Sequence, residues 1–431
     1  MGKKKDQNRK TAMQILVEVE SSKAYSNIAA NALIRKNDPD SPALVREIVY
    51  GVLKNKMYID YILAYLTDKP LKKIKGEALA ILRMGIYQMI FMGSVPEYAA
   101  VSTSVDLAKA HAYGQAGFVN AILRSWIRLH EKISLPDKEL DLAAHYSIRY
   151  SYPEWIVKMW IDRYGESFAE ELMAAGNETP DLCIRANTLK TDREKLIGAL
   201  VNSGFKVEKG RNSNSAIYVK GTGLLDGKLF SKGHFSVQDE SSMLAVEVLD
   251  PQKGEFLIDV CSAPGGKTLY AAERMENEGR IEAFDIHEHK LEMLRAAAEQ
   301  NGISIVRTML WNGTETYGEY LEMADRVLVD APCSGLGVVR RKPEIKYARD
   351  EDILDKLSEV QFSILSASSK YVRSGGILVY TTCTLMRQEN EDVVNRFLDA
   401  DPEFEKLSQR TLFPNIDGTD GFFICKMRKK K

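Results

Sequence analysis

The sequence predicts an α/β protein whose C-terminal half forms a doubly wound, mostly parallel sheet. From Phe235 onward, short apolar runs alternate with helical patterns, which is the arrangement of a sheet covered by helices on both faces. Apolar residues in the first 132 positions recur only at helical spacing, which indicates an all-helical front domain. A chain of 431 residues is long enough for two or three domains.

Changes in patterning predict the domain boundaries. We expect an all-helical domain over 1–132, a linker over 133–140, a small α/β module over 141–235 and the sheet domain over 236–431. The module should contain a strand within 181–190, a helix over 192–202, and strands at 205–208 and 216–220.

Six apolar runs predict the strands of the large sheet. They lie at 256–260, 281–285, 305–309, 326–330, 376–380 and 423–427, and the last is expected at the edge. In such sheets ligands bind outside the carboxyl ends of the strands. The most informative motifs of this chain follow directly after three of these runs.

Composition narrows the class of protein. Hydrophobic content is 45% and charged content 28%, as in ordinary soluble domains. No apolar run is long enough to span a membrane, and none follows the basic start as in a signal peptide. Five widely spaced cysteines without a C-x-x-C pair argue against disulfides and structural zinc. We therefore expect a cytoplasmic protein without a metal and without a membrane partner.

Charge is distributed unevenly along the chain. Residues 1–140 contain 21 Lys and Arg against 14 Asp and Glu, a net of +7, whereas the rest contains 38 against 46, a net of −8. A basic front half favours phosphate binding. Solvated helix faces carry scattered lysines equally often, so both interpretations remain open.

A glycine-rich turn follows the first strand of the sheet. Pro264, Gly265 and Gly266 force a sharp turn between the strand at 256–260 and a helix expected over 268–275. Strand, turn and helix in this order place a ligand on free backbone N–H groups. Alone, such a turn is a weak signal that many α/β proteins share.

The spacing around this turn limits the ligand. The dinucleotide fingerprint G-x-G-x-x-G is absent, and Cys261 stands where a phosphate-binding Walker A loop has its first glycine. Asp285 ends the next strand, twenty positions after Gly265, where an acid can bind both hydroxyls of a ribose. The pattern favours a nucleoside-bearing cofactor without a phosphate chain, and S-adenosylmethionine fits.

Two cysteines, fifty positions apart, each lie in a motif that follows a predicted strand. Cys333 lies in Asp330–Gly337, and Cys383 lies in Tyr380–Asn390. A lone cysteine at a strand end is more often a small buried hydrophobe. Two of them in polar loops beside a cofactor site favour nucleophilic chemistry. The residues alone leave open which cysteine attacks.

The front domain resembles a known helical family. Leu44–Leu53, Pro96–Val101 and Gly117–Arg124 resemble the NusB-type RNA-binding domain, which is fused in front of certain RNA methyltransferases. Arg124 lies in the last of these motifs and is a candidate RNA contact.

The sheet domain carries a more specific resemblance. Asp259–Thr268, Asp330–Gly335 and Thr382–Cys383 resemble the RNA cytosine-C5 methyltransferases. Together with the front domain, nearly the whole chain resembles the RsmB (Sun) family of 16S rRNA methyltransferases. The resemblance implies a Rossmann-like domain that uses S-adenosylmethionine, with 16S rRNA as the substrate. We expect a monomer.

The resemblance also implies roles for individual residues. Cys383 would be the nucleophile, Cys333 would assist release of the methylated base, and Asp330 would face the base. The implied cofactor positions are Cys261, Ser262, Ala263, Pro264, Gly265, Gly266, Lys267, Asp285, Asn312 and Asp330. A thiolate that adds to carbon 6 of cytosine makes carbon 5 nucleophilic enough to take a methyl group.

Two stretches depart from the family pattern. Asn312 stands where the family usually has an acid after the third strand, although an amide oxygen still accepts a hydrogen bond from an adenine amino group. Met386, Arg387 and Gln388 precede Glu389, so the usually acidic segment is partly neutralised and its role is in doubt.

A basic cluster follows the Cys333 motif. Arg340, Arg341, Lys342 and Lys346 are interpreted as contacts to RNA phosphates near the target nucleotide, or alternatively as a solvated loop. The target cytidine must be unstacked before a thiol can reach its ring.

Three other functions compete with the leading one. Related enzymes modify cytidines of tRNA or of other rRNA. A non-catalytic RNA-binding assembly or antitermination factor would leave the two cysteines idle, which their intact motifs argue against. A P-loop ATPase would need a glycine at the position of Cys261.

Overall fold

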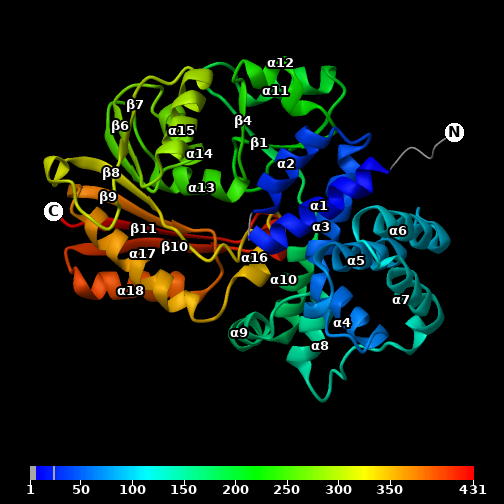
Figure 1. Ribbon diagram of the computed structural model, residues 1–431. Coiled ribbons are helices and arrows are strands. Elements are labelled where there is room, and N and C mark those ends of the chain that lie inside the picture. The colour runs from blue at the N-terminus through cyan, green and yellow to red at the C-terminus, as the bar shows by residue number, and fades with distance from the viewer. Residues whose placement is uncertain (1–5, 23–24) are drawn as a thin grey trace. The chain divides into compact units, whose positions relative to one another are not determined.

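The computed structural model describes residues 6–22 and 25–431 and divides into two compact units (Figure 1). Unit 1 comprises 1–178 and 339–349, and unit 2 comprises 179–338 and 350–431. The first five positions of the predicted helical domain lie outside the described residues, as do residues 23 and 24.

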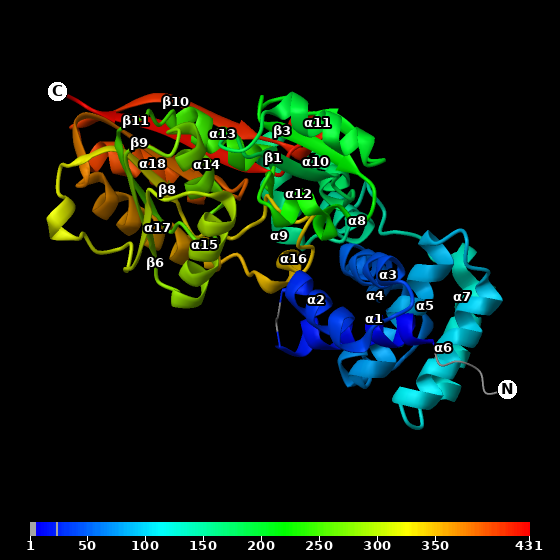
Figure 2. The same ribbon diagram turned by 90° about the horizontal axis from the view of Figure 1, so that it is seen from above.

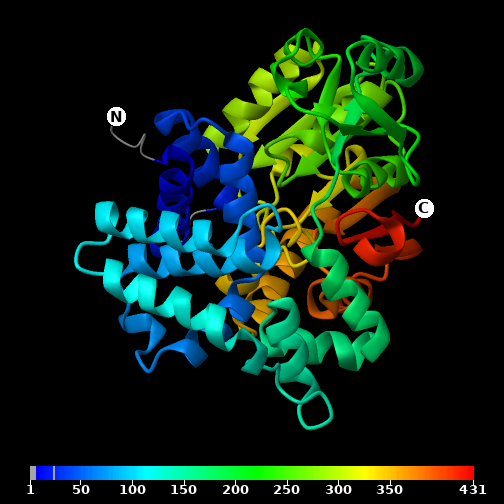
Figure 3. The ribbon, with the colours of Figure 1, turned by 90° about the vertical axis from the view of Figure 1, so that its right-hand side faces the viewer.

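Unit 1 is built from helices, as the front of the sequence predicts. Figure 3 shows three of them, in blue to cyan, running side by side: α5, α6 and α7. The helices of the continuous part are α1 (Gln7–Ser22), α2 (Ser26–Asn37), α3 (Pro42–Lys54), α4 (Lys56–Leu66), α5 (Gly76–Phe91), α6 (Glu97–His111), α7 (Ala116–Leu129), α8 (Leu142–Tyr150), α9 (Glu154–Tyr164) and α10 (Glu166–Asn177).

Helix α3 shows how the sequence sets these elements. Ser41 caps its start by accepting a hydrogen bond from the Leu44 N–H at 3.3 Å, and Pro42 occupies the first helical position. A Cβ atom on Gly51 would lie 2.0 Å from the Tyr87 ring. This position therefore requires glycine, because any side chain would push α3 away from α5.

Unit 1 continues beyond the predicted helical domain. Helices α8, α9 and α10 pack within unit 1, whose continuous part reaches residue 178. Tyr146, Tyr152 and Trp160 are buried there. These aromatic side chains belong to the interior of unit 1.

A segment that follows the Cys333 motif belongs to unit 1. We call residues 339–349 the strap; it includes the short helix α16 (Ile345–Ala348). Glu344 accepts hydrogen bonds from the backbone N–H of Ser26 at 2.9 Å and from its hydroxyl at 2.7 Å. The hydroxyl of Tyr347 donates to the Leu53 carbonyl at 2.8 Å.

Lys346 holds the strap in place from inside unit 1. Its side chain is fully buried, and its ammonium donates to the Lys54 carbonyl at 3.0 Å and to Asn177 Oδ1 at 3.0 Å. It also lies 4.2 Å from the centroid of the Tyr152 ring. The predicted RNA contact at Lys346 is therefore corrected, because a buried ammonium bonded to protein oxygens is not available to a phosphate.

Unit 2 begins with the small module. Its four antiparallel strands have the order β2-β3-β1-β4, and the residues that form its core include Ile184, Leu196, Leu200 and Ile217. The elements are β1 (Leu182–Ala186), α11 (Arg193–Asn202), β2 (Lys206–Lys209), β3 (Ala216–Lys220), α12 (Lys228–Ser231) and β4 (Phe235–Val237).

The large sheet has seven strands in the order β10-β11-β9-β8-β5-β6-β7. The five strands from β9 to β7 are parallel, which confirms the predicted doubly wound sheet. The strands are β5 (Phe256–Val260), β6 (Arg280–Asp285), β7 (Val306–Leu310), β8 (Ala324–Asp330), β9 (Val372–Thr382), β10 (Phe404–Leu412) and β11 (Phe422–Lys429).

The edge of this sheet was predicted wrongly. β11 is not the edge strand, because it pairs antiparallel with both β9 and β10 (Figure 2). Only Phe404 and Leu412, at the two ends of β10, are buried. Its polar middle carries no strand signal in the sequence, which is why this outer strand was missed.

Helices cover both faces of the sheet, as Figure 1 shows. Leu257 packs in the cluster with α13, α14 and α15, and its neighbour Ile258 packs in the cluster with α17 and α18. This alternation is the period of two that strands impose. The helices are α13 (Glu240–Leu249), α14 (Gly266–Arg274), α15 (Glu288–Asn301), α17 (Ile353–Ser369) and α18 (Glu391–Ala400).

Within the described residues, no helix combines the length and apolar character needed to cross a bilayer.

Substituting Lys346 tests the strap. Lys346→Met leaves buried acceptors unpaired, so it should lower the free energy of unfolding of unit 1 by about 2 kcal/mol. Tryptophan fluorescence during urea unfolding measures this change, since Trp126, Trp155 and Trp160 all lie in unit 1. Lys158→Met, on an exposed face of α9, is the matched control, and equal effects of the two substitutions would refute the role of Lys346.

Candidate functional site

The site residues of unit 2 follow three adjacent parallel strands. β5, β8 and β9 are neighbours in the sheet, so their carboxyl ends meet at one edge. The glycine turn at 261–267 follows β5, the Cys333 loop follows β8, and the Cys383 loop follows β9. The strand order thus brings together motifs that are more than a hundred positions apart.

The glycine turn has a backbone that few side chains tolerate. Cys261 has φ 64° and Gly265 has φ 105°, both in the left-handed region. A Cβ atom on Gly265 would lie 2.2 Å from the side chain of Leu294. Helix α14 begins directly after Gly265, and the N–H groups of its first turn have no acceptors within the helix. The turn therefore presents backbone donors to a ligand.

Asp285, at the end of β6, is fixed beside the turn. Its Oδ2 accepts a hydrogen bond from the Ala263 N–H at 3.3 Å, and its Oδ1 accepts from the His287 N–H at 2.9 Å. Each carboxylate oxygen keeps a further lone pair. The side chain is therefore held in a fixed position beside the turn, where the sequence analysis expects a ribose contact.

Asp259 is a fully buried acid near the end of β5. Its Oδ2 accepts a hydrogen bond from the Thr268 hydroxyl at 2.6 Å, while its Oδ1 has no hydrogen-bond partner among the described residues. Burial raises its pKa to about 7, and the neighbouring acids Asp330 and Asp285 add to the rise. The region is thus already rich in negative charge.

Lys267 links the turn to the acid at the end of β8. Its ammonium lies 2.7 Å from Asp330 Oδ2, and the hydroxyl of Thr381 on β9 donates to Asp330 Oδ1 at 2.8 Å. Burial works against the charge of Lys267, but the contact with Asp330 outweighs it and raises the pKa of the lysine. Both oxygens of Asp330 are thereby oriented, one by Lys267 of α14 and the other by Thr381 of β9.

The two predicted catalytic cysteines face each other. The sulfur atoms of Cys333 and Cys383 are 3.1 Å apart, both thiols are free, and both side chains are partly exposed. The hydrogen bond to Cys383, together with burial, raises the pKa of Cys333 well above its usual value. Either sulfur can donate the hydrogen bond that joins the two thiols.

Glu389 anchors the Cys333 loop through hydrogen bonds. It is fully buried and accepts hydrogen bonds from the Ser334 N–H at 2.7 Å and from Gln361 Nε2 at 3.0 Å. The Ser334 hydroxyl donates to its other oxygen. The sequence had left the role of this acid in doubt, because Met386–Gln388 interrupt the family pattern. The structure gives it a clear positioning role.

Asn390 does the same for the Cys383 loop. Its Oδ1 accepts a hydrogen bond from the Thr382 hydroxyl, and its Nδ2 donates to the Thr384 carbonyl at 3.0 Å. These two threonines flank Cys383 in the chain. Consecutive residues 389 and 390 therefore hold the two cysteine loops, one each.

The other candidates lie elsewhere. Asn312 is exposed after β7, and its amide is bonded to Glu315 and to the Thr314 N–H. Arg124 is exposed on α7 in unit 1. Arg340 is buried. The burial of Lys54, and after it the nearby charge of Arg340, lowers the pKa of Lys54 to about 8.

Arg341 and Lys342 complete the basic cluster. Both are half-buried in the strap, and the ammonium of Lys342 lies 4.7 Å from the centroid of the Tyr25 ring. Only these two members of the cluster and Arg124 retain the exposure that a phosphate contact requires.

Comparisons with known families divide the chain into three parts. A family model of the 16S rRNA methyltransferase RsmB/F matches residues 246–428. A NusB family model matches 6–128, and a model of an RsmF/B-like, ferredoxin-like domain matches 152–224.

Full-length relatives agree with these matches. The chain is 38% identical to the probable ribosomal RNA small subunit methyltransferase B of Bacillus subtilis, over 99% of this chain and 100% of that protein. It is 32% identical to the probable protein of the same name from Synechocystis, over 98% and 99% of the two chains. The crystal structure of a methyltransferase homolog protein from Pyrococcus horikoshii has a TM-score of 0.61 and 29% identity, covering 66% of this chain and 97% of that one.

The buried acid of β5 gives a pH-dependent prediction. Between about pH 4 and pH 7 the unfolded chain loses the Asp259 proton while the folded chain keeps it, so folding becomes less favourable as pH rises through this window. Compared with Asp259→Asn, the native protein should lose up to about 4 kcal/mol of its free energy of unfolding between these two pH values. Urea unfolding of both proteins at several pH values measures the difference. A difference that stays constant from pH 4 to 7 would contradict the shifted pKa.

Proposed function

The chain belongs to the RsmB family of small subunit ribosomal RNA methyltransferases, and from this premise we propose that it methylates carbon 5 of a cytidine in 16S rRNA. The methyl donor we propose is S-adenosylmethionine. The observation that carries the proposal is the pair of free thiols 3.1 Å apart at the carboxyl end of the sheet.

The chemistry requires a nucleophile because carbon 5 of cytosine does not attack a methyl group unaided. Addition of the Cys383 thiolate to carbon 6 moves an electron pair to carbon 5, which then takes the methyl group. A base then takes the proton from carbon 5, the electron pair of that bond restores the double bond between carbons 5 and 6, and the Cys383 sulfur leaves as a thiolate. Covalent catalysis of this kind divides one difficult step into easier ones.

The contact between the thiols supports a joint role in the reaction. The division of roles follows the family resemblance, with Cys383 as the attacking sulfur. Cys333, 3.1 Å from the departing sulfur, is placed to assist the release step, in which the enzyme and the methylated base separate.

Asp330 is the group that we assign to the cytosine amino edge. Its carboxylate is held by Lys267 and Thr381, and a carboxylate accepts a hydrogen bond from an amino group. That contact would fix the ring and support the charge that the addition step places on it.

The turn at 261–267 and Asp285 fit the proposed cofactor. The left-handed backbone leaves no room for a side chain at Gly265, and free N–H groups and a fixed acid lie beside it. When bound, S-adenosylmethionine supplies the sulfonium methyl group. Asn312 belongs to this assignment as a possible acceptor for the adenine amino group. Lys267 is paired with Asp330, which does not suit a phosphate-binding loop.

RNA recognition is assigned to unit 1 and the small module. Arg124 on α7, with Arg341 and Lys342 of the strap, is the set of cations that we propose as phosphate contacts. The NusB family match at 6–128 supports RNA binding by the helical part.

Transfer of a labelled methyl group to unmodified 16S rRNA, with tRNA as the parallel substrate, tests the choice of RNA. Label found on tRNA alone would overturn the proposed substrate but keep the chemistry.

The nucleophile is tested by removing its sulfur. Cys383→Ala should lower methyl transfer at least about 10⁴-fold, because the covalent route is lost. Cofactor affinity, measured by calorimetry, should stay within twofold of the native value. Cys425→Ala, at a buried cysteine of β11, is the matched control. Turnover by Cys383→Ala at a native rate would exclude this residue as the nucleophile.

The release residue predicts a trapped species. Cys333→Ala keeps Cys383 but lacks the thiol that assists separation, so the protein should accumulate as a covalent complex with its RNA. Denaturing gel electrophoresis with S-adenosylmethionine and 16S rRNA measures the slowly migrating fraction. The double variant Cys333→Ala/Cys383→Ala should show none, and an equal fraction in both variants would contradict the division of roles.

A further inference from the structure

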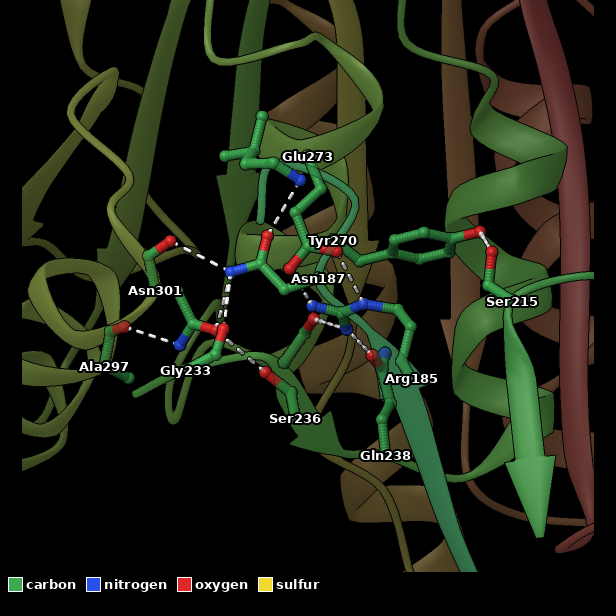
Figure 4. Close-up of polar contacts among 12 residues, drawn as sticks. Arg185, Asn187, Ser215, Gly233, Ser236, Gln238, Tyr270, Glu273, Ala297 and Asn301 are labelled. Carbon is green, nitrogen blue, oxygen red and sulfur yellow. Dashed lines mark hydrogen bonds and ion pairs between the residues drawn. The ribbon is translucent and has the colours of Figure 1, made fainter. Parts of the chain in front are cut away.

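A fully buried arginine joins the small module to the glycine turn. Arg185 lies on β1 of the module, and its side chain has no exposed surface. Successive residues of β1 face opposite sides: Ile184 packs in the module core, whereas Cys183 packs in the cluster with α13 and α14. Arg185 shares the face of Cys183, as expected from strand geometry, and Figure 4 shows its contacts.

The guanidinium of Arg185 contacts α14 at three positions. Its Nε and one terminal nitrogen donate to the two oxygens of Glu273, at 3.1 and 2.6 Å. The other terminal nitrogen donates to the Gly266 carbonyl at 3.1 Å and also to Gln238 Oε1. Its central carbon lies 4.6 Å from the centroid of the Tyr270 ring.

These contacts lie along one face of the helix. Positions 266, 270 and 273 are separated by four and three residues, which places them on one side of an α-helix. Gly266 is both the first residue of α14 and part of the proposed cofactor turn. The next residue, Lys267, orients Asp330.

A second side chain from the same strand end holds the neighbouring helix. Asn187, just after β1, donates to the carbonyls of Gly233 at 2.8 Å and of Asn301 at 2.9 Å. Asn301 is the last residue of α15. The end of β1 therefore braces both α14 and α15, the helices that precede and follow the strand bearing Asp285.

Stability alone does not explain an ion pair at this position. Replacing a buried pair by apolar residues is often neutral or stabilising, so the pair itself is weak evidence for a stabilising role. What an apolar contact does not provide is the planar, directional fork that bonds a carboxylate and a carbonyl at once.

We propose that Arg185 is a positioning residue for methyl transfer: it holds the first turn of α14, and with it the glycine turn and Lys267, in the geometry that binds the cofactor. The inference rests on the proposed use of this turn for S-adenosylmethionine. It assigns to the small module, besides RNA recognition, a structural part in forming the cofactor site.

Calorimetric titration of the full-length protein with S-adenosylmethionine tests this role. Arg185→Met should raise the dissociation constant about tenfold or more, because the apolar side chain fills the space without holding the Gly266 carbonyl. Arg185→Lys should restore part of the affinity, since an ammonium reaches one partner but lacks the fork. Glu273→Gln, which keeps an acceptor for Arg185 but not the charge, should show an intermediate increase.

A half-buried arginine–glutamate pair supplies the control. Arg326 on β8 makes two hydrogen bonds to Glu255, at 2.9 and 3.1 Å, and both residues lie at the opposite, amino-terminal end of their strands. Arg326→Met should lower the melting temperature but leave the dissociation constant within twofold of the native value. All titrations are made well below the lowest melting temperature, with circular dichroism confirming the fold.

The outcomes separate the inference from the proposed function. If the native protein binds S-adenosylmethionine and Arg185→Met binds it equally well, Arg185 is only structural and the inference is wrong. If Arg185→Met does not fold, the dissociation constants of Arg185→Lys and Glu273→Gln for S-adenosylmethionine decide instead, and native values for both would refute the inference. A native protein that does not bind the cofactor would overturn the cofactor assignment itself. A rise in the Michaelis constant for the cofactor, without one for RNA, would add support from kinetics.

Discussion

The parallel pairing of β8 with β9 is the constraint on which the rest of the site depends. It places Asp330 opposite Thr381 in register, so the loops that carry Cys333 and Cys383 leave the sheet side by side. The 3.1 Å contact of the two sulfurs follows from this register together with the two polar residues beneath, Glu389 and Asn390. A slip of this register would separate the two cysteines to which we assign attack and release.

Buried charged groups fix the elements around this pair. Lys267 reaches Asp330 from the turn after β5, and Arg185 reaches the start of α14 from the small module. Each group is costly to bury unless its partners are present. As a result, the glycine turn and the start of α14 are each held in a single defined position.

How far the sequence predicted this structure depended on the range of the interactions. Strands such as β5 and β6 were evident, because short apolar runs followed by an acid are local signals. The polar strand β10 was not, since its place in the sheet is set by pairing with β11 rather than by a local pattern. Arg185 and Glu273 are 88 positions apart, and no local pattern marks such a pair. The motifs located the cysteines, but only the structure showed what holds them.

Direct identification of the attacking sulfur tests the central claim. The native protein is incubated with S-adenosylmethionine and 16S rRNA that contains 5-fluorocytidine, whose carbon 5 has no proton to lose after methyl transfer. The covalent complex is digested, and mass spectrometry identifies the peptide that carries the nucleotide. The account predicts attachment at Cys383 alone. Attachment at Cys333, or efficient methylation of normal RNA with no covalent complex on the fluorinated one, would contradict it.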